Sequence, residues 1–141
     1  MAQTIQQQRA KYALECVTAL TGQHHFTKEQ QKNFISYANS LPAMIHTNGL
    51  GQTMAFHKAK GSNNALNETD DKKRSYNALY KIVSDWLCRP PQVYENYDDV
   101  LKGITQEQIQ SYQLAQAEAL VLMSWVKKFA KAFLAEEESQ S

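Results

Sequence analysis

The sequence predicts an all-α fold, a compact single-domain bundle of about five to six helices organised around a long C-terminal helix. Glycine and proline are scarce, with 5 and 3 copies among 141 residues, so few positions interrupt a helix. Apolar residues recur at the i, i+3, i+4, i+7 spacing of a helix face, and no segment alternates with the period of two typical of strands. We expect one domain over residues 1–141, with disordered tails at about 1–3 and 136–141.

The first helix is expected from about Gln3 to Leu20. Its apolar residues form one stripe that consists of Ile5, Tyr12, Cys16, Val17 and Leu20. Gly22 follows, and glycine readily adopts the left-handed conformation that ends a helix.

The second helix is expected to begin at Thr27. Thr27 and Gln30 have the spacing of a capping box, in which the hydroxyl and the amide each bind an orphan backbone N–H group. Pro42 lies inside the apolar stripe that follows. Because proline removes a donor and clashes with the carbonyl four residues earlier, we expect a kink or break near Ser40.

A sharp junction is expected at residues 46–49, where Thr47 or Asn48 could cap the next helix. This helix should end at Lys60, and the polar, Asn-rich segment 61–71 is typical of a loop.

Residues 76–87 form the clearest helical pattern, and Pro90 and Pro91 stop it. We interpret residues 93–102 as a connector. Thr105 and Gln108 have the spacing of a second capping box, so the last helix should run from there to about Leu134, roughly 45 Å at 1.5 Å per residue.

The residues that carry catalysis or bind metals form no recognisable constellation. The histidines make no HxxxH pair, Cys16 and Cys88 have no ligand-like neighbours, and no GxSxG motif is present. We expect no enzyme activity, metal, cofactor or small-molecule substrate. Two free cysteines and the lack of an apolar run of about 18 residues predict a cytoplasmic protein outside the membrane.

Two interpretations of Gly49-Leu50-Gly51 remain open. Backbone N–H groups at a helix start could hold a phosphate, although no Lys-Ser/Thr pair follows as in a Walker loop. The structural alternative is that small residues allow close helix packing, and the two interpretations are compatible.

The chain is mildly basic outside its acidic end. Its net charge is +1, but without Glu136, Glu137 and Glu138 the remaining fifteen Lys and Arg residues face eleven acids, a net charge of +4. Basic residues cluster at Arg9 and Lys11, at Lys58 and Lys60, at 72–74, and at Lys127, Lys128 and Lys131. Such clusters are compatible with RNA binding, with an ordinary solvated surface, or, for residues 127–134, with a membrane-surface helix.

Three segments together resemble one known family. They are residues 9–14 (RAKYAL), residues 41–56 (LPAMIHTNGLGQTMAF), and residues 112–120 (YQLAQAEAL), which continue through Trp-Val-Lys-Lys-Phe-Ala at 125–130. In order and spacing they resemble the small helical subunit of type III-B (Cmr) CRISPR effectors. The Asn-Gly-Leu-Gly junction is the most specific part.

The resemblance implies an all-α, non-catalytic subunit that stacks in several copies along a complex and helps to hold target RNA beside the CRISPR RNA. Its partners would be other Cmr-type subunits, copies of itself and the RNA. Arg9, Asn48, Lys58, Lys127 and Lys128 match motif positions on the RNA-facing or subunit-facing surface. With the other clustered lysines, the predicted interface is Arg9, Lys11, Asn48, Lys58, Lys60, Lys127, Lys128 and Lys131.

A second hypothesis is a helical protein-interaction module without direct RNA contact. The small subunit of type III-A effectors belongs to this alternative, because sequence separates it poorly from the type III-B subunit. The two hypotheses differ in the expected effect of salt, since only phosphate contacts weaken strongly as ionic strength rises.

Overall fold

The computed structural model describes residues 3–61 and 70–135, and these residues form an all-α fold without strands. The helices are α1 (Ile5–Thr21), α2 (Lys28–Lys60), α3 (Asp71–Leu87), α4 (Val100–Gln106) and α5 (Ile109–Phe133). The predicted all-α bundle with a long C-terminal helix is therefore confirmed. Within the described residues no helix is both long and apolar enough to span a bilayer.

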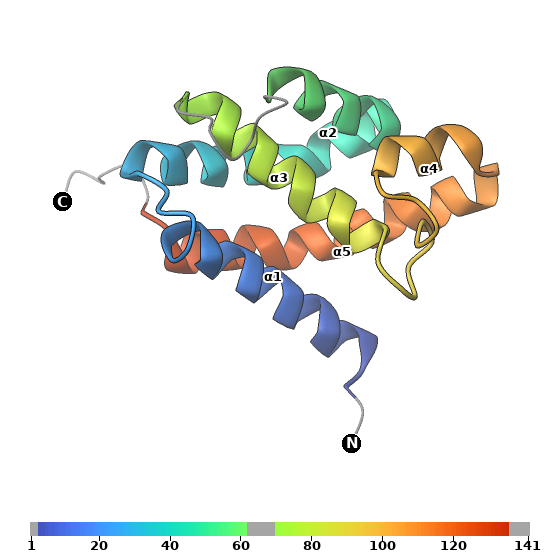
Figure 1. The fold of residues 1–141 in the computed structure, drawn as a ribbon, viewed down its shortest axis with the longest axis horizontal. Helices are drawn as coiled ribbons and strands as arrows, with labels where there is room; N and C mark the ends of the chain where they lie inside the picture. Colours follow the sequence, from blue (N-terminus) through green and yellow to red (C-terminus); the bar gives the residue numbers. More distant parts are fainter. Residues whose placement is uncertain (1–2, 62–69, 136–141) are drawn as a thin grey trace.

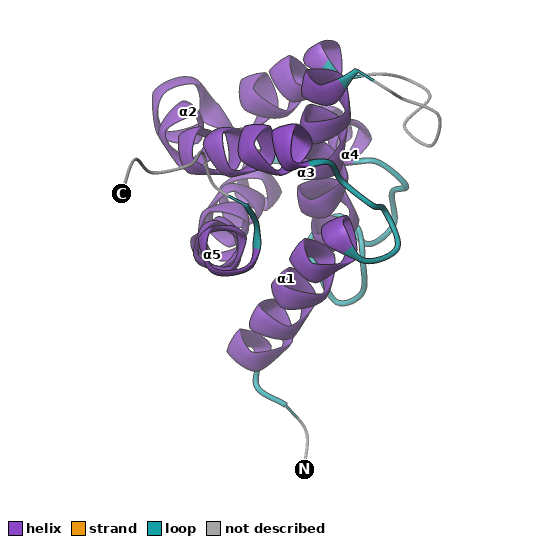
Figure 2. Cartoon of the chain, turned by 90° about the vertical axis from the view of Figure 1, so that its left-hand side faces the viewer, coloured by secondary structure: helices purple, strands orange, loops and turns teal. Residues whose placement is uncertain are grey.

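Helices α2 and α5 are the centre of the packing. Helix α2 packs against both α3 and α5, while α1 packs mainly against α5. Figure 1 shows α5 running below α2 and α3 along the long axis, and Figure 2 shows it nearly end-on with α1 beside it. The largest side chains of this core are fully buried and include Phe34, Leu41, Ile45, Leu79, Leu87, Leu122 and Met123.

Capping boxes begin the first two helices. The Thr27 hydroxyl accepts from the Gln30 N–H at 3.1 Å, and the Gln30 side chain accepts from the Thr27 N–H at 3.0 Å, which confirms the prediction. Thr4 and Gln7 form an equivalent box that the sequence analysis missed. Helix α1 therefore begins at Ile5, two residues later than expected.

Of the kink or break expected near Ser40, the break is wrong, because α2 continues through Pro42 and the non-helical residue inside it is Gly49. Leu41 and Ile45, which flank the proline, are fully buried. Burying two such side chains contributes roughly 1.5–3 kcal/mol each, enough to offset the cost of about 3 kcal/mol of a proline inside a helix.

The interruption of α2 lies at Gly49, inside the predicted junction, where φ is 86° and ψ is 162°. The helix that resumes is capped by α5 rather than by Thr47 or Asn48. The Leu50 N–H donates to Gln116 Oε1 at 2.9 Å, and the Gly51 N–H donates to the Tyr112 hydroxyl at 3.0 Å.

These two contacts decide between the interpretations of Gly49-Leu50-Gly51. The N–H groups that could have held a phosphate already bind side chains of α5. A Cβ atom at Gly49 would lie 2.8 Å from the Tyr112 hydroxyl oxygen. The small residues thus serve close helix packing, and the phosphate interpretation is not supported.

The segment between α3 and α5 differs from the expected connector. It contains α4, whose N-cap Asp99 accepts from the Leu101 N–H at 3.0 Å. Thr105 does not cap the last helix, because its hydroxyl donates to the Leu101 carbonyl at 2.8 Å within α4. Helix α5 begins at Ile109 after Gln108, which makes no side-chain cap.

The predicted loop over residues 61–71 lies largely outside the described residues. Its described ends are Gly61, which ends α2, and Asp70, whose side chain accepts from the Lys73 N–H at 3.0 Å and caps α3. The predicted tails also lie outside the described residues, except for Gln3.

Candidate nucleic-acid interface

A basic groove lies between the first half of α2 and the last turns of α5. Its volume is about 760 Å³. Helix α2 contributes Lys32, Asn33, Ile35, Ser36 and Asn39, and helix α5 contributes Lys127, Lys128 and Lys131. We call this the lysine groove. No acid occurs among the described residues that line it.

Helical periodicity explains why these side chains share one groove. Lys32, Ile35, Ser36 and Asn39 lie at positions i, i+3, i+4 and i+7 and form a single face of α2, while Asn33 follows Lys32 at its edge. On α5, the buried stripe through Val126 and Ala130 faces the core, which directs the neighbouring lysines to its edge. The backbone N–H of Ala135 donates to Gln31 Oε1 at 2.9 Å and holds the end of α5 against α2.

The groove combines cations with polar groups. Lys128 and Lys131 are exposed, whereas Lys32 and Lys127 are half-buried, so their aliphatic stems line the groove and shield it partly from water. The Asn33 side-chain Nδ2 is buried and has no hydrogen-bond partner within the described part of the chain. Four ammonium groups with adjacent amides and a hydroxyl suit a chain of phosphates.

The predicted interface residues on α1 are placed elsewhere. Arg9 forms a two-point ion pair with Glu118, and its side chain is only 13% exposed. Trp86 Nε1 donates to the same carboxylate at 2.9 Å. Arg9 is thus engaged in holding α1 to α5, while Lys11 is exposed and lines a small hollow beside Arg89.

The remaining predicted residues lie on the second part of α2 and at its kink. Asn48 is exposed and directly precedes Gly49. The Lys58 ammonium lies 5.1 Å from the centre of the Tyr80 ring, and that of Lys60 lies 5.6 Å from the centre of the Phe56 ring. The structure therefore brings together only Lys127, Lys128 and Lys131 of the predicted set.

Sequence reasoning missed the contribution of α2 to the lysine groove. Lys32 and Asn39 were available as a polar i, i+7 pair on the first half of α2. The sequence alone could not show that this face lies opposite residues almost one hundred positions later.

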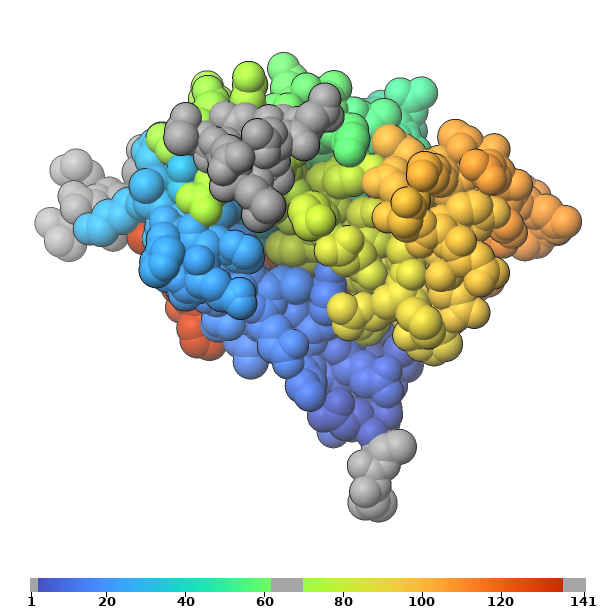
Figure 3. Space-filling view, viewed as in Figure 1, coloured from blue at the N-terminus to red at the C-terminus, as the bar shows by residue number. Residues whose placement is uncertain are grey.

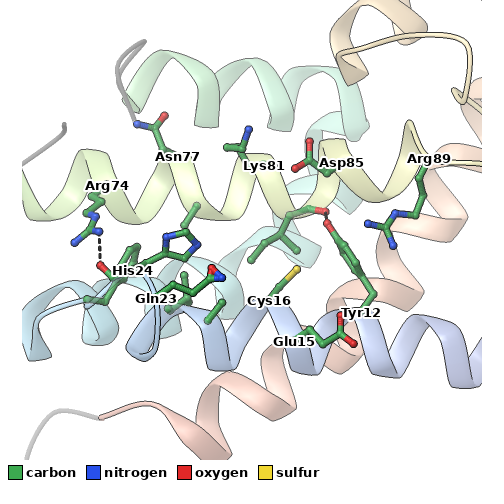
Figure 4. A pocket seen from close by; sticks show the side chains of 15 residues that line it. Tyr12, Glu15, Cys16, Gln23, His24, Arg74, Asn77, Lys81, Asp85 and Arg89 are labelled. Atoms are coloured by element: carbon green, nitrogen blue, oxygen red, sulfur yellow. Dashed lines mark hydrogen bonds between the residues drawn. The ribbon is translucent and has the colours of Figure 1, made fainter. Parts of the chain in front are cut away.

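A second hollow lies between α1 and α3, with a volume of about 530 Å³. Figure 3 shows the face of the molecule on which α3 and the loop after α1 lie, and Figure 4 shows the lining side chains. Its floor is mainly apolar, and its arginines already have partners. Arg74 donates to the His24 carbonyl, and the Arg89 guanidinium lies 4.4 Å from the centre of the Tyr12 ring.

Two side chains that line this hollow, Cys16 and Tyr12, are largely buried. Burial raises the pKa of the Cys16 thiol to about 11, so the nucleophilic thiolate is scarce at neutral pH. The Tyr12 hydroxyl donates to the Ile82 carbonyl at 2.6 Å and therefore has a structural role. Among the described residues, no group of three or more His, Cys, Asp or Glu side chains could hold a metal ion.

The lysine groove thus gathers four lysines without an acid among its described lining residues, on a helical scaffold with a kink at Gly49. Comparison with protein families agrees with the resemblance seen in the sequence. Residues 5–133 match the family of CRISPR-associated proteins named Cas_Cmr5, which spans every helix described above. The chain therefore belongs to the Cas_Cmr5 family, the small subunits of type III-B CRISPR effector complexes.

Proposed function

We propose that this Cmr subunit is non-catalytic and helps to hold RNA in the effector complex through the lysine groove. The observation that carries the proposal is the convergence of Lys32, Lys127, Lys128 and Lys131 in one groove without an acid among its described lining residues. Lysine contacts to phosphate neutralise charge without reading bases. Such binding suits a complex in which pairing with the guide RNA reads the sequence.

The proposal that the subunit stacks with copies of itself and with other Cmr subunits is supported by a different surface. The outward face of α5 carries exposed apolar side chains, Leu114 at 65% and Val121 at 42% exposure, among exposed polar residues such as Gln113 and Ser124. Glu118 is the one charged side chain from Ile109 to Val126, and it is engaged by Arg9. Exposed apolar side chains of this kind are typical of protein interfaces.

We also propose that the complex lies in the cytoplasm, where Cys16 and Cys88 stay reduced.

The test of RNA contact is charge reversal in the assembled complex. We expect Lys127→Glu with Lys128→Glu to weaken target-RNA capture roughly tenfold or more at physiological salt, since each lost phosphate contact also loses counterion release. The matched control is Lys73→Glu with Lys81→Glu on α3, which changes the net charge equally on exposed positions outside the groove. Capture is measured by filter binding and folding by circular dichroism.

Equal RNA capture by the native and groove-reversed complexes would exclude this groove as the RNA contact. Loss of the subunit from the complex, with its fold intact, would instead indicate that these lysines contact another subunit. That second result would support the alternative function, a helical interaction module without direct RNA contact.

A further inference from the structure

A cluster of aromatic rings lies between α2 and α3, one helical turn from the lysine groove. The rings of Tyr37 and Tyr76 are stacked, with centroids 3.9 Å apart and planes at 8°. The Phe56 ring meets Tyr76 edgewise, with centroids 6.0 Å apart and planes at 83°. Asn33, which lines the groove, precedes Tyr37 by four residues and therefore lies on the same face of α2. The aromatic cluster thus begins beside the groove.

Phe56 is the exposed member of this cluster. It is 39% exposed, whereas Tyr37 and Tyr76 are half-buried. Its ring meets Tyr76 and His57 edgewise, with planes at 83° and 73°, and no ring of the described residues is stacked on it. The Lys60 ammonium lies 5.6 Å from the ring centre. A planar group could therefore stack on this ring in place of the Lys60 side chain.

Positive charge accompanies the exposed ring. Lys58 and Lys60 are exposed on the last turn of α2. The acids on the neighbouring elements already accept hydrogen bonds within the fold. Asp70 caps α3, Asp71 accepts from a glutamine side chain of α2 at 2.9 Å, and Asp99 accepts from a tyrosine hydroxyl of α3 at 2.6 Å. An aromatic ring next to two lysines suits a nucleotide, which has a flat base and a negative phosphate.

We propose that Phe56, supported by Tyr76 and Tyr37, is a platform on which unpaired bases of RNA stack beside the lysine groove. This inference rests on the proposed RNA contact and adds a second site, whose ligand is the base rather than the phosphate. An exposed cation–π contact is weaker than the stacking of a base on an aromatic ring. A base therefore replaces Lys60 on the ring, and the released ammonium binds the adjacent phosphate.

The platform requires bases that are not paired. In a duplex both faces of a base are covered by its neighbours, so only a single strand can present a base to a side chain for stacking. Lysine contacts to phosphate do not read bases. The lysine groove alone would therefore hold any RNA backbone, whereas the platform favours unpaired nucleotides of any sequence.

The platform is tested by fluorescence anisotropy of the full chain at low salt with two fluorescein-labelled strands of about 12 nucleotides. One strand is oligouridine, and the other is an abasic strand with the same number of phosphates. The native chain should bind oligouridine roughly fivefold or more tightly than the abasic strand. Phe56→Leu removes the ring but keeps an apolar side chain, so it should abolish this difference, whereas Phe56→Trp should retain it.

The matched control is Phe133→Leu. Phe133 is the other exposed phenylalanine, at 55% exposure, and it lies on the last turn of α5. This variant should keep the native preference for oligouridine, and circular dichroism should show that both leucine variants are folded. Phe56→Trp also gives a direct signal, because a base stacked on the new indole should quench its emission. The native chain, which contains Trp86 and Trp125, is the blank for this titration. The abasic strand should cause no additional quenching.

The outcomes separate the platform from the lysine groove. Equal binding of the two strands by the native chain, binding of neither strand, or equal losses in both leucine variants would overturn the platform. Lys127→Gln with Lys131→Gln should weaken the binding of both strands alike and reduce its dependence on salt. If these lysine changes have no effect while the preference for oligouridine persists, the groove fails as the RNA contact although the platform stands.

Discussion

Arg9 on α1 and Glu118 on α5 form a two-point ion pair, with Nε to Oε2 at 2.5 Å and Nη2 to Oε1 at 2.9 Å. Both side chains are largely buried, at 13% and 15% exposure, and Trp86 of α3 donates to the same carboxylate. One acid thereby joins three helices, and 109 residues separate the two ends of the ion pair in the sequence.

Glu118→Ala should lower the free energy of unfolding by about 2–4 kcal/mol, because it leaves a part-buried guanidinium and an indole N–H without their acceptor. Urea denaturation followed by circular dichroism measures the loss. The control Asp98→Ala removes the exposed ion pair with Lys102 and should leave the urea midpoint unchanged. Equal losses of unfolding free energy for both variants would show that the buried Glu118 ion pair stabilises the fold no more than the exposed Asp98 ion pair.

Gly49→Ala should destabilise the protein by about 2 kcal/mol or more. At φ 86° a side chain is strained, and the new Cβ would lie 2.8 Å from the Tyr112 hydroxyl. Gly51→Ala is the matched control two residues later, where the nearest atom would be Ile104 Cγ2 at an ordinary 3.4 Å. The control should be neutral or slightly stabilising in thermal unfolding. A larger destabilisation by Gly51→Ala than by Gly49→Ala would contradict the position of the kink at Gly49.

The stability of the fold should depend on pH through His57. The side chain is 1% exposed, and burial lowers its pKa below the ordinary value of 6.5, although its Nδ1 lies 3.0 Å from the Thr53 carbonyl. Below pH 6.5 the unfolded chain therefore binds a proton at His57 that the folded chain does not bind. Stability should fall as pH drops from about 6.5 towards the folded-state pKa, and it should be constant with respect to this group above pH 7.

The measurement is the slope of the unfolding free energy against pH between 7.5 and 5. His57→Gln should flatten the slope, whereas the control His46→Gln, at an exposed position, should retain it. An unchanged slope in the His57 variant would assign the acid sensitivity to other groups.

The two cysteines should be slow to alkylate in the folded protein. Burial raises the pKa of Cys16 and of Cys88 to about 11 each, from an ordinary value of 9.0. A pKa of about 11 in place of 9.0 leaves about a hundredfold less thiolate near neutral pH. The iodoacetamide reaction at pH 8 should therefore be at least tenfold slower than in 8 M urea, as followed by intact mass. Similar rates in both conditions would show that the thiols are accessible thiolates.

Periodicity and capping predicted those parts of the fold that depend on near neighbours. The stripe of α3 and the capping box of Thr27 and Gln30 are local, and both are confirmed. The break expected at Pro42 does not occur, because burial of Leu41 and Ile45 offsets the local cost of a proline inside a helix. Helix α4 was missed because Gly103 lies in its middle, where the Tyr94 ring packs so closely that a Cβ would lie 2.5 Å from it.

The site could be predicted only in part for a related reason. Lys127, Lys128 and Lys131 are close in sequence, so their common surface follows from one helix. Their partner Lys32 comes from α2, and only the packing of α2 on α5 brings it near. Arg9 looked like a free cation, because nothing near it in sequence indicates that Glu118 neutralises it.

The caps that α5 provides at Gly49 also concern the order of events during synthesis. The second part of α2 obtains acceptors for its first N–H groups from Tyr112 and Gln116, more than sixty residues further along the chain. A ribosome-bound chain that lacks α5 would therefore have this helix end bonded only to water. The nascent protein should reach its full resistance to proteases only after α5 has emerged, because α1 packs mainly on α5 and the second part of α2 takes its caps from it.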